Sequence, residues 1–289
     1  MPKTKATSKA KTAAKSSAKP KAVKAEKSTT TTTRAASATT TPVVTAEVKR
    51  SKNIFTRPLR NDLTLGALFA ELIGAFGLTA ILLSTNGNAI VAGVTVLVFV
   101  MVFSRVSGGH INPAVTLGML ALRKVSALRA AGYIVAQILG AMLALVVIGQ
   151  FVSTAPATPP TMDPYTGQEV QGAAAKIFAV ADLQGDWRPF FAEALGAIVL
   201  GLGVAAAALN RRSDLETGYI IGGALMLGLL LATQASAAIV NPAIAIGLGA
   251  YKLSNWWTVL VYAVAPLIGT ILGALAYKLI KHDSELETA

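Results

Sequence analysis

The stretch Ser107-Gly-Gly-His-Ile-Asn-Pro-Ala-Val-Thr116 interrupts a largely apolar part of the chain, and its core returns as Val240-Asn-Pro-Ala-Ile-Ala-Ile-Gly247. Proline suits the first turn of a helix, because its missing N–H would have no intrahelical partner there. The glycines before the first copy allow the backbone to turn sharply. Each Asn-Pro-Ala therefore predicts a helix that begins at its proline and follows an irregular loop.

Apolar segments of about 20 residues recur on both sides of these motifs, the length that crosses a hydrocarbon core about 30 Å thick. The sequence predicts six spans, at 64–84, 88–106, 126–150, 188–209, 217–235 and 256–280. Two further apolar pieces, Pro113–Leu122 and Pro242–Tyr251, begin at the motifs and reach about 15 Å as helices. We expect an all-α membrane protein with six transmembrane helices and two re-entrant half-helices.

Region 61–281 is also an internal repeat, with halves at about 63–150 and 188–281. An offset of 129 residues keeps one register through five pairs: Asn112/Asn241, Gly118/Gly247, Tyr133/Tyr262, Gln137/Pro266 and Gly140/Gly269. Each half holds three spans, an odd number, so we expect the second half to lie inverted in the membrane.

The distribution of charge predicts how the spans are oriented in the membrane and sets residues 1–60 apart as a tail. Residues 1–60 hold 15 of the 26 Lys and Arg and 2 of the 14 Asp and Glu. This Lys/Ala/Ser/Thr-rich segment cannot bury enough apolar surface to offset its ordering entropy, so we expect it to be disordered. Contact with anionic lipid or nucleic acid and a merely solvated tail both stay open. Residues 282–289 are expected to form a C-terminal tail.

Basic residues beside the spans fall on one side when the N-terminus is cytoplasmic. That side receives Arg123, Lys124, Arg129, Arg211, Arg212, Lys278 and Lys281, whereas the loop 151–187 and Lys252 fall on the other. We therefore expect both termini to be cytoplasmic, in a multi-pass protein of the plasma (inner) membrane.

Inversion would bring both half-helices to the membrane midplane, where their N-termini face each other. Each N-terminus carries roughly half a positive charge, and Asn112 and Asn241 add amide donors. A neutral molecule with lone pairs is favoured at such a point, whereas cations are repelled and a proton-conducting chain of water is interrupted. Irregular backbone at this depth implies a wet path. The predicted midplane residues are Asn112, Pro113, Ala114, Asn241, Pro242 and Ala243.

These motifs resemble the major intrinsic proteins, the family of aquaporins and aquaglyceroporins. The resemblance covers about residues 63–281 and rests on the two inverted Asn-Pro-Ala motifs and on Ala-Glu-x-x-Gly at 70–74 and 192–196. It implies a passive channel rather than an enzyme, for water and small uncharged solutes such as glycerol, urea or ammonia. It also implies a homotetramer without cofactor or metal.

The resemblance further implies an outer constriction of four side chains, which commonly includes an arginine directly after the second Asn-Pro-Ala. The corresponding positions here are Ala92, Leu229, Ala238 and Ile244. A constriction without ring, imidazole or guanidinium is wide, or at least apolar, and lacks the arginine's positive charge. The chain therefore matches neither the water nor the glycerol subtype.

Four ionisable residues have competing interpretations. Arg105 either faces a cytoplasmic vestibule, where it repels cations, or snorkels toward headgroups. His110 is either a hydrogen-bonded loop histidine or a vestibule residue that responds to pH. Glu71 and Glu193 lie within spans, which suggests a proton relay. The resemblance instead favours acceptors for the backbone of each re-entrant loop.

Two other functions stay open at this point. A secondary transporter with broken helices would share the inverted repeat. A membrane anchor would make the basic tail the main functional part. Enzyme signatures such as a Walker loop, a dinucleotide glycine pattern, zinc-ligand spacing or a nucleophile elbow do not occur in the sequence. The sequence contains no cysteine, so a disulfide or thiolate metal site is excluded.

Overall fold

The computed structural model describes residues 63–154, 161–170, 183, 185–210, 212–251 and 255–287. The chain divides into two units, Met1–Lys52 and Asn53–Ala289, and all described residues belong to the second. The predicted basic tail at 1–60 and much of the loop 151–187 lie outside the described residues.

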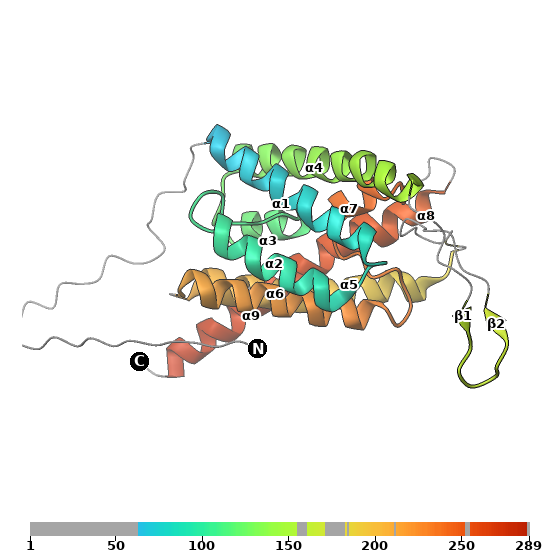
Figure 1. Cartoon of the computed structure of the whole chain (residues 1–289). Helices are drawn as coiled ribbons and strands as arrows, with labels where there is room; N and C mark the ends of the chain where they lie inside the picture. The colour runs from blue at the N-terminus through green and yellow to red at the C-terminus, as the bar shows by residue number, and fades with distance from the viewer. Residues whose placement is uncertain are drawn as a thin grey trace, which may run out of the picture. The chain divides into compact units, whose positions relative to one another are not determined.

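Long helices make up most of the second unit (Figure 1): α1 (Leu65–Ser84), α4 (Ala127–Thr154), α5 (Trp187–Leu209), α6 (Asp214–Ala232) and α9 (Ala265–Glu287). The short helix α8 (Trp256–Val259) and the π-helical turn η2 (Leu260–Val264) lead into α9. With α8 and η2 joined to α9, the described residues contain five helices long and apolar enough to cross a membrane.

The helix at the predicted second span is shorter than expected. α2 (Ala89–Phe103) is apolar but only 15 residues long, which gives about 22 Å. Asn88 caps its N-terminus by accepting the N–H groups of Ile90 and Val91. The chain leaves the helix after Phe103 and enters the turn that leads to Gly108 and Gly109, so three of the predicted residues belong to the loop.

Both predicted half-helices are present, as α3 (Pro113–Ala121) and α7 (Pro242–Gly247). Each has proline at its first position and an asparagine cap, the arrangement that satisfies an exposed N–H at a helix start. α7 ends at Gly247 rather than at the predicted Tyr251. Leu248 closes it with bonds to the carbonyls of Ile244 and Ile246, and Gly249 then adopts a φ of 62°.

The two halves pack in matching ways. α1 packs on α4 and α5 packs on α9, while α2 packs on α6. In Figure 1, α3 and α7 are drawn among the long helices; α3 contacts α4, α5 and α9, and α7 contacts α1, α4 and η2. Gly140 of α4 approaches the Leu72 carbonyl, and its counterpart Gly269 of α9 approaches the Ala194 carbonyl. Across the described residues the fold is all-α, apart from one short strand pair.

The last predicted span is interrupted, for a reason that lies in the sequence. Pro266 has no N–H, so the carbonyl of Tyr262 four residues earlier loses its helical donor. Such a proline commonly produces a kink or a π-bulge, and η2 lies directly before it. The hydroxyl of Tyr251 donates to the free Tyr262 carbonyl over 3.0 Å. Beyond the break, α9 continues through Glu287, so most of the predicted C-terminal tail is helical.

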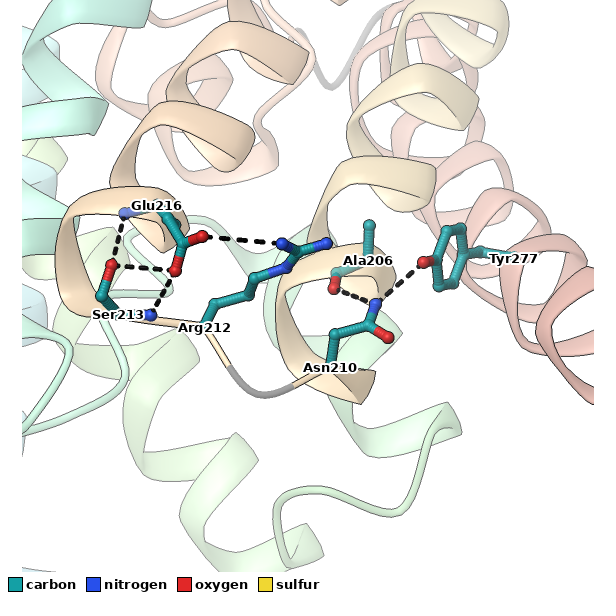
Figure 2. A network of polar contacts seen from close by, with 6 residues as sticks. All are labelled: Ala206, Asn210, Arg212, Ser213, Glu216 and Tyr277. Atoms are coloured by element: carbon teal, nitrogen blue, oxygen red, sulfur yellow. Dashed lines mark hydrogen bonds and ion pairs between the residues drawn. The ribbon is translucent and has the colours of Figure 1, made fainter. Parts of the chain in front are cut away.

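Polar contacts tie the turn between α5 and α6 to α9 (Figure 2). The amide of Asn210 donates to the Ala206 carbonyl over 2.7 Å and to the Tyr277 hydroxyl oxygen over 2.8 Å. Ser213 and Glu216 form a capping box at the start of α6, and Arg212 lies 3.6 Å from the Glu216 carboxylate. The turn is therefore held from both of its helices and from α9.

The loop between α4 and α5 contains an antiparallel strand pair, β1 (Thr161–Met162) and β2 (Glu169–Val170). The Asp163 carboxylate accepts the N–H groups of Tyr165 and Thr166 across the connecting turn. These hydrogen bonds stabilise the ionised carboxylate and hold the pKa of Asp163 below its ordinary value. This part of the predicted loop is therefore an ordered hairpin.

Candidate functional site

The two asparagines at the half-helix N-termini bond to the loop of the opposite half. The Asn112 amide nitrogen donates to the Val240 carbonyl over 2.9 Å, and that of Asn241 donates to the Ile111 carbonyl over 3.2 Å. Their side-chain oxygens accept the N–H groups of Ala114 and Ala243. An amide nitrogen carries two protons, so within the described residues each asparagine keeps one for another acceptor.

The acceptor carbonyls belong to residues with an uncommon backbone. Ile111 has a φ of 57° and Val240 a φ of 47°, a left-handed conformation that is disfavoured for β-branched residues. Glu71 accepts the N–H groups of His110 and Ile111 over 2.9 and 2.6 Å. The buried Glu71 carboxylate thus holds Ile111 in a backbone conformation that this residue would not adopt alone.

The second half repeats this arrangement in register. Glu193 accepts the N–H groups of Ile239 and Val240 over 2.9 and 2.7 Å. Ser107 and Ser236, which are 129 residues apart like the two asparagines, each accept the N–H group two residues later over 3.0 Å. Both glutamates are fully buried. The contacts of Glu71 and Glu193 are those of loop-supporting residues, because each carboxylate serves the backbone of its own re-entrant loop.

A polar stripe on α4 supports the first re-entrant loop, and sequence analysis did not assign it to the site. The Tyr133 hydroxyl donates to the Ser107 carbonyl over 2.7 Å and accepts from the Arg129 guanidinium, also over 2.7 Å. Gln137 donates to Glu71 and to the Thr116 hydroxyl oxygen. Arg129, Tyr133 and Gln137 follow one another at four-residue spacing, the helical signal that could have identified the stripe.

Arg129 was expected among the charges on the membrane surface, but the structure buries it to 4% exposure. The reason is its place in the stripe, where its guanidinium lies over the Tyr133 ring, 5.0 Å from the centroid. The corresponding stripe in the second half keeps only the tyrosine. Tyr262 corresponds to Tyr133, whereas Thr258 and Pro266 stand in place of Arg129 and Gln137.

The two predicted vestibule residues lie in different surroundings. His110 is buried, with its Nδ1 3.2 Å from the Thr116 hydroxyl and its ring edge-on to Tyr133. The side chain of Arg105 is 86% exposed and forms an ion pair of 2.5 Å with Asp214 at the start of α6. A vestibule role for either residue stays a prediction.

The four predicted outer positions all belong to one buried apolar cluster, which also contains Ile111, Ile239 and Val240. Ala92 and Ala238 come from α2 and the second re-entrant loop, and Leu229 and Ile244 from α6 and the first turn of α7. No side chain among these four can form a hydrogen bond or carry a charge. All four side chains are therefore apolar and buried, and their place at an outer constriction stays a prediction.

Comparison with known proteins gives consistent results. A family model described as "Major intrinsic protein" matches residues 83–277. The "Glycerol uptake facilitator protein-like 6" of Lactiplantibacillus plantarum is 31% identical over 220 residues, 71% of this chain and 93% of that relative. "Aquaporin-1" of Sus scrofa is 30% identical over 230 residues, 78% of this chain and 73% of that relative.

Solved structures agree on the fold. The aquaglyceroporin from Plasmodium falciparum superposes with a TM-score of 0.54 at 19% identity, covering 76% of this chain and 97% of its own. The helices long enough to span a membrane and these relatives make the chain an integral multi-pass membrane protein. Proteins of the matched family are channels and not enzymes. This chain belongs to the major intrinsic protein family.

Proposed function

We propose that the protein is a passive transmembrane channel for water and small uncharged solutes, such as glycerol, urea or ammonia. The observation that carries the proposal is the crosswise bonding of Asn112 and Asn241, which leaves one amide proton of each where the two half-helices meet. These two donors can hold the oxygen or nitrogen of a neutral molecule, and each is fixed by its other bonds.

The same geometry supports exclusion of cations and protons. The N-termini of α3 and α7 carry partial positive charge toward this point, so a cation would lose its hydration without gaining an acceptor. A water molecule that accepts from both asparagines cannot accept another proton from its neighbour in the path. We infer that Asn112-Pro113-Ala114 and Asn241-Pro242-Ala243 form the midplane filter.

The outer constriction supports a solute range beyond water alone. Ile244 follows the second Asn-Pro-Ala, so the path lacks a charged donor at that place. We propose that Ala92, Leu229, Ala238 and Ile244 line it. Further parts of the proposal are a homotetramer in the plasma (inner) membrane with both termini cytoplasmic, and contact of the basic tail with anionic lipid headgroups.

Light scattering from proteoliposomes tests the function directly, with water, glycerol and urea gradients compared. A channel gives flux that rises linearly with the gradient, whereas a secondary transporter saturates and depends on a coupling ion. Replacement of Asn241 by Asp should raise the cation leak, because it introduces a negative charge at the filter. Fast water flux without any solute flux would refute the wide solute range.

A further inference from the structure

The three tryptophans of the chain lie together where α5 and α8 begin. The ring of Trp187 is edge-on to that of Trp257, with centroids 4.4 Å apart, and the ring of Trp256 is edge-on to it at 5.6 Å. Trp257 is buried, whereas Trp187 and Trp256 are 54% and 67% exposed. Two exposed indole rings therefore rest on a buried one.

Hydrogen bonds between the two helix starts fix this arrangement. The indole N–H of Trp257 donates to the Asp186 carbonyl over 3.2 Å. The amide of Asn255, which caps α8, donates to the Leu183 carbonyl over 2.7 Å. The segment before α5 is thereby joined to the start of α8. Rings that are held in place before a ligand arrives lose little conformational freedom when it binds.

An exposed ion pair lies beside these rings. The Asp186 carboxylate accepts the backbone N–H of Arg188 over 3.0 Å and pairs with its guanidinium over 2.6 Å. Asp186 and Arg188 are the only charged residues among the described ones at 183–191 and 255–264. Their side chains are 40% and 83% exposed, and such pairs contribute only about 0–1 kcal/mol. Both charges are therefore available to a third group, and together they cancel.

We propose that this surface binds the headgroup of a zwitterionic phospholipid, with phosphocholine as the best match. The site consists of Asp186, Trp187, Arg188 and Trp256. Phosphocholine carries the complementary two charges: its phosphate accepts from the guanidinium, and its quaternary ammonium lies over the exposed indole rings beside the carboxylate. An anionic headgroup would meet the same carboxylate without an ammonium to balance it.

The surroundings of the ion pair identify the partner as a lipid rather than a free phosphocholine. One turn beyond Trp187 on α5, Phe191 is an exposed apolar residue, and Val259 occupies the same place beyond Trp256 on α8. Tryptophan rings favour the level of the headgroups, with apolar segments beneath them. An acyl chain below the bound headgroup would therefore contact apolar side chains.

Tryptophan fluorescence reports on this site alone, because the chain has no other tryptophan. Full-length protein in a maltoside detergent would be titrated with short-chain phosphatidylcholine, phosphatidylethanolamine and phosphatidylglycerol of identical acyl chains, and with free phosphocholine. Native mass spectrometry would count the bound lipids. The variants are Trp256→Leu, Trp256→Phe and Arg188→Gln. Tyr219→Leu is the matched control, since Tyr219 is an exposed aromatic residue of α6 outside the cluster.

Phosphatidylcholine should saturate one site per chain with a Kd about tenfold below that of phosphatidylglycerol, because two rings contact its ammonium. Phosphatidylethanolamine should lie between them. Trp256→Leu should raise the Kd of phosphatidylcholine about threefold and leave that of phosphatidylglycerol unchanged, and Trp256→Phe should recover part of the loss. Arg188→Gln should weaken both lipids, whereas Tyr219→Leu should match the native chain.

Equal binding of the three lipids would show a general aromatic anchor at the interface and overturn the proposal. Tighter binding of phosphatidylglycerol would overturn it in favour of an anionic headgroup. Free phosphocholine that binds as tightly as the lipid would refute the acyl contact and thus the choice of a lipid. If Trp256→Leu does not elute as a single folded species, Arg188→Gln decides, and an unchanged Kd for phosphatidylcholine in that variant would overturn the site.

Discussion

The backbone conformations of Ile111 and Val240 are determined by residues that are distant in the sequence. A left-handed conformation costs a β-branched residue about 1–3 kcal/mol and persists only where the surroundings enforce it. Glu71 and Glu193 enforce it here by binding the N–H of each residue. The carbonyls of Ile111 and Val240 then accept the asparagine of the opposite half. Each glutamate therefore positions a donor in the half to which it does not belong.

Glu193→Gln should destabilise the protein by roughly 1–3 kcal/mol, because one of the buried N–H groups of Ile239 and Val240 would lose its acceptor. The apparent Tm in detergent would measure the loss. Glu169→Gln is the control, since Glu169 lies exposed in the hairpin. Equal Tm values for the two variants would refute a supporting role for Glu193.

Arg105→Ala should leave the Tm nearly unchanged, because an exposed ion pair contributes about 0–1 kcal/mol. If Arg105 repels cations at a vestibule, the same variant should increase cation leak in liposomes, and Arg105→Lys should restore the barrier. Unchanged ion leak and solute flux in Arg105→Ala would refute the vestibule role. The ion pair with Asp214 would then be the role that the structure supports for Arg105.

The asparagines, prolines and glutamates of the site could be predicted because their local chemistry is distinctive. Proline at a helix start and a capping asparagine act within a few residues. The conformations of Ile111 and Val240 could not be predicted, since local preference opposes them and the cause is a carboxylate on another helix. The burial of Arg129 was missed because its partner Tyr133 offers no charge that would indicate an internal guanidinium.

At the scale of elements, helix starts were easier to predict than helix ends. α3 and α7 both begin where the sequence indicates, yet α7 stops four residues before the predicted Tyr251. Its end depends on the closing bonds of Leu248 and the turn at Gly249, which apolarity does not report. Pro266 was visible in the sequence, but the position of η2 also depends on Tyr251 as a donor.

Gly273→Ala should destabilise the contact between α5 and α9 by about 1–3 kcal/mol through overpacking. A Cβ at this position would overlap the Ile198 carbonyl, whereas a Cβ at Gly223 of α6 would meet no atom within 4 Å. Gly223→Ala should therefore be neutral or slightly stabilising, as alanine favours helix. Thermal unfolding of the two variants would compare them, and a similar loss in both would contradict the packing argument.

Tyr251→Phe should cost about 1 kcal/mol, because the Tyr262 carbonyl freed by Pro266 would lose its donor. Pro266→Ala supplies a helical N–H to the same carbonyl, so the double variant should lose less than the sum of the single variants. Tyr165→Phe is a control, since Tyr165 is 96% exposed. Strict additivity in Tm would argue that Tyr251 does not replace the missing bond.

At the scale of the whole molecule, the described helices pack mainly on one another. α1 packs on α4 and α5 packs on α9 through close backbone contacts, and α3 and α7 each contact elements of both halves. Along the sequence, 15 of the 26 Lys and Arg fall in residues 1–60, before the first of these helices. This division separates a transport function of the helices from any binding function of the tail.

Deletion of residues 1–55 should change water and solute flux less than twofold, because the hydrogen bonds that hold Asn112 and Asn241 are made within residues 111–243. Light scattering with purified full-length and shortened protein in the same vesicles would measure it. Loss of flux on deletion would show that the tail takes part in conduction. Normal flux with a lost cellular phenotype would favour the membrane anchor.

The crosswise bonds of Asn112 and Asn241 have a consequence for ancestry. If one half existed alone, its asparagine would lack the carbonyl that accepts its amide proton. The carbonyl of its left-handed residue would likewise lack the asparagine that donates to it. Such a half could complete its bonds only by pairing with an inverted copy of itself. Gln137 bonds to Glu71 and Thr116 of its own half, so the presence of Pro266 at the corresponding place in the second half leaves the crosswise bonds of the asparagines intact.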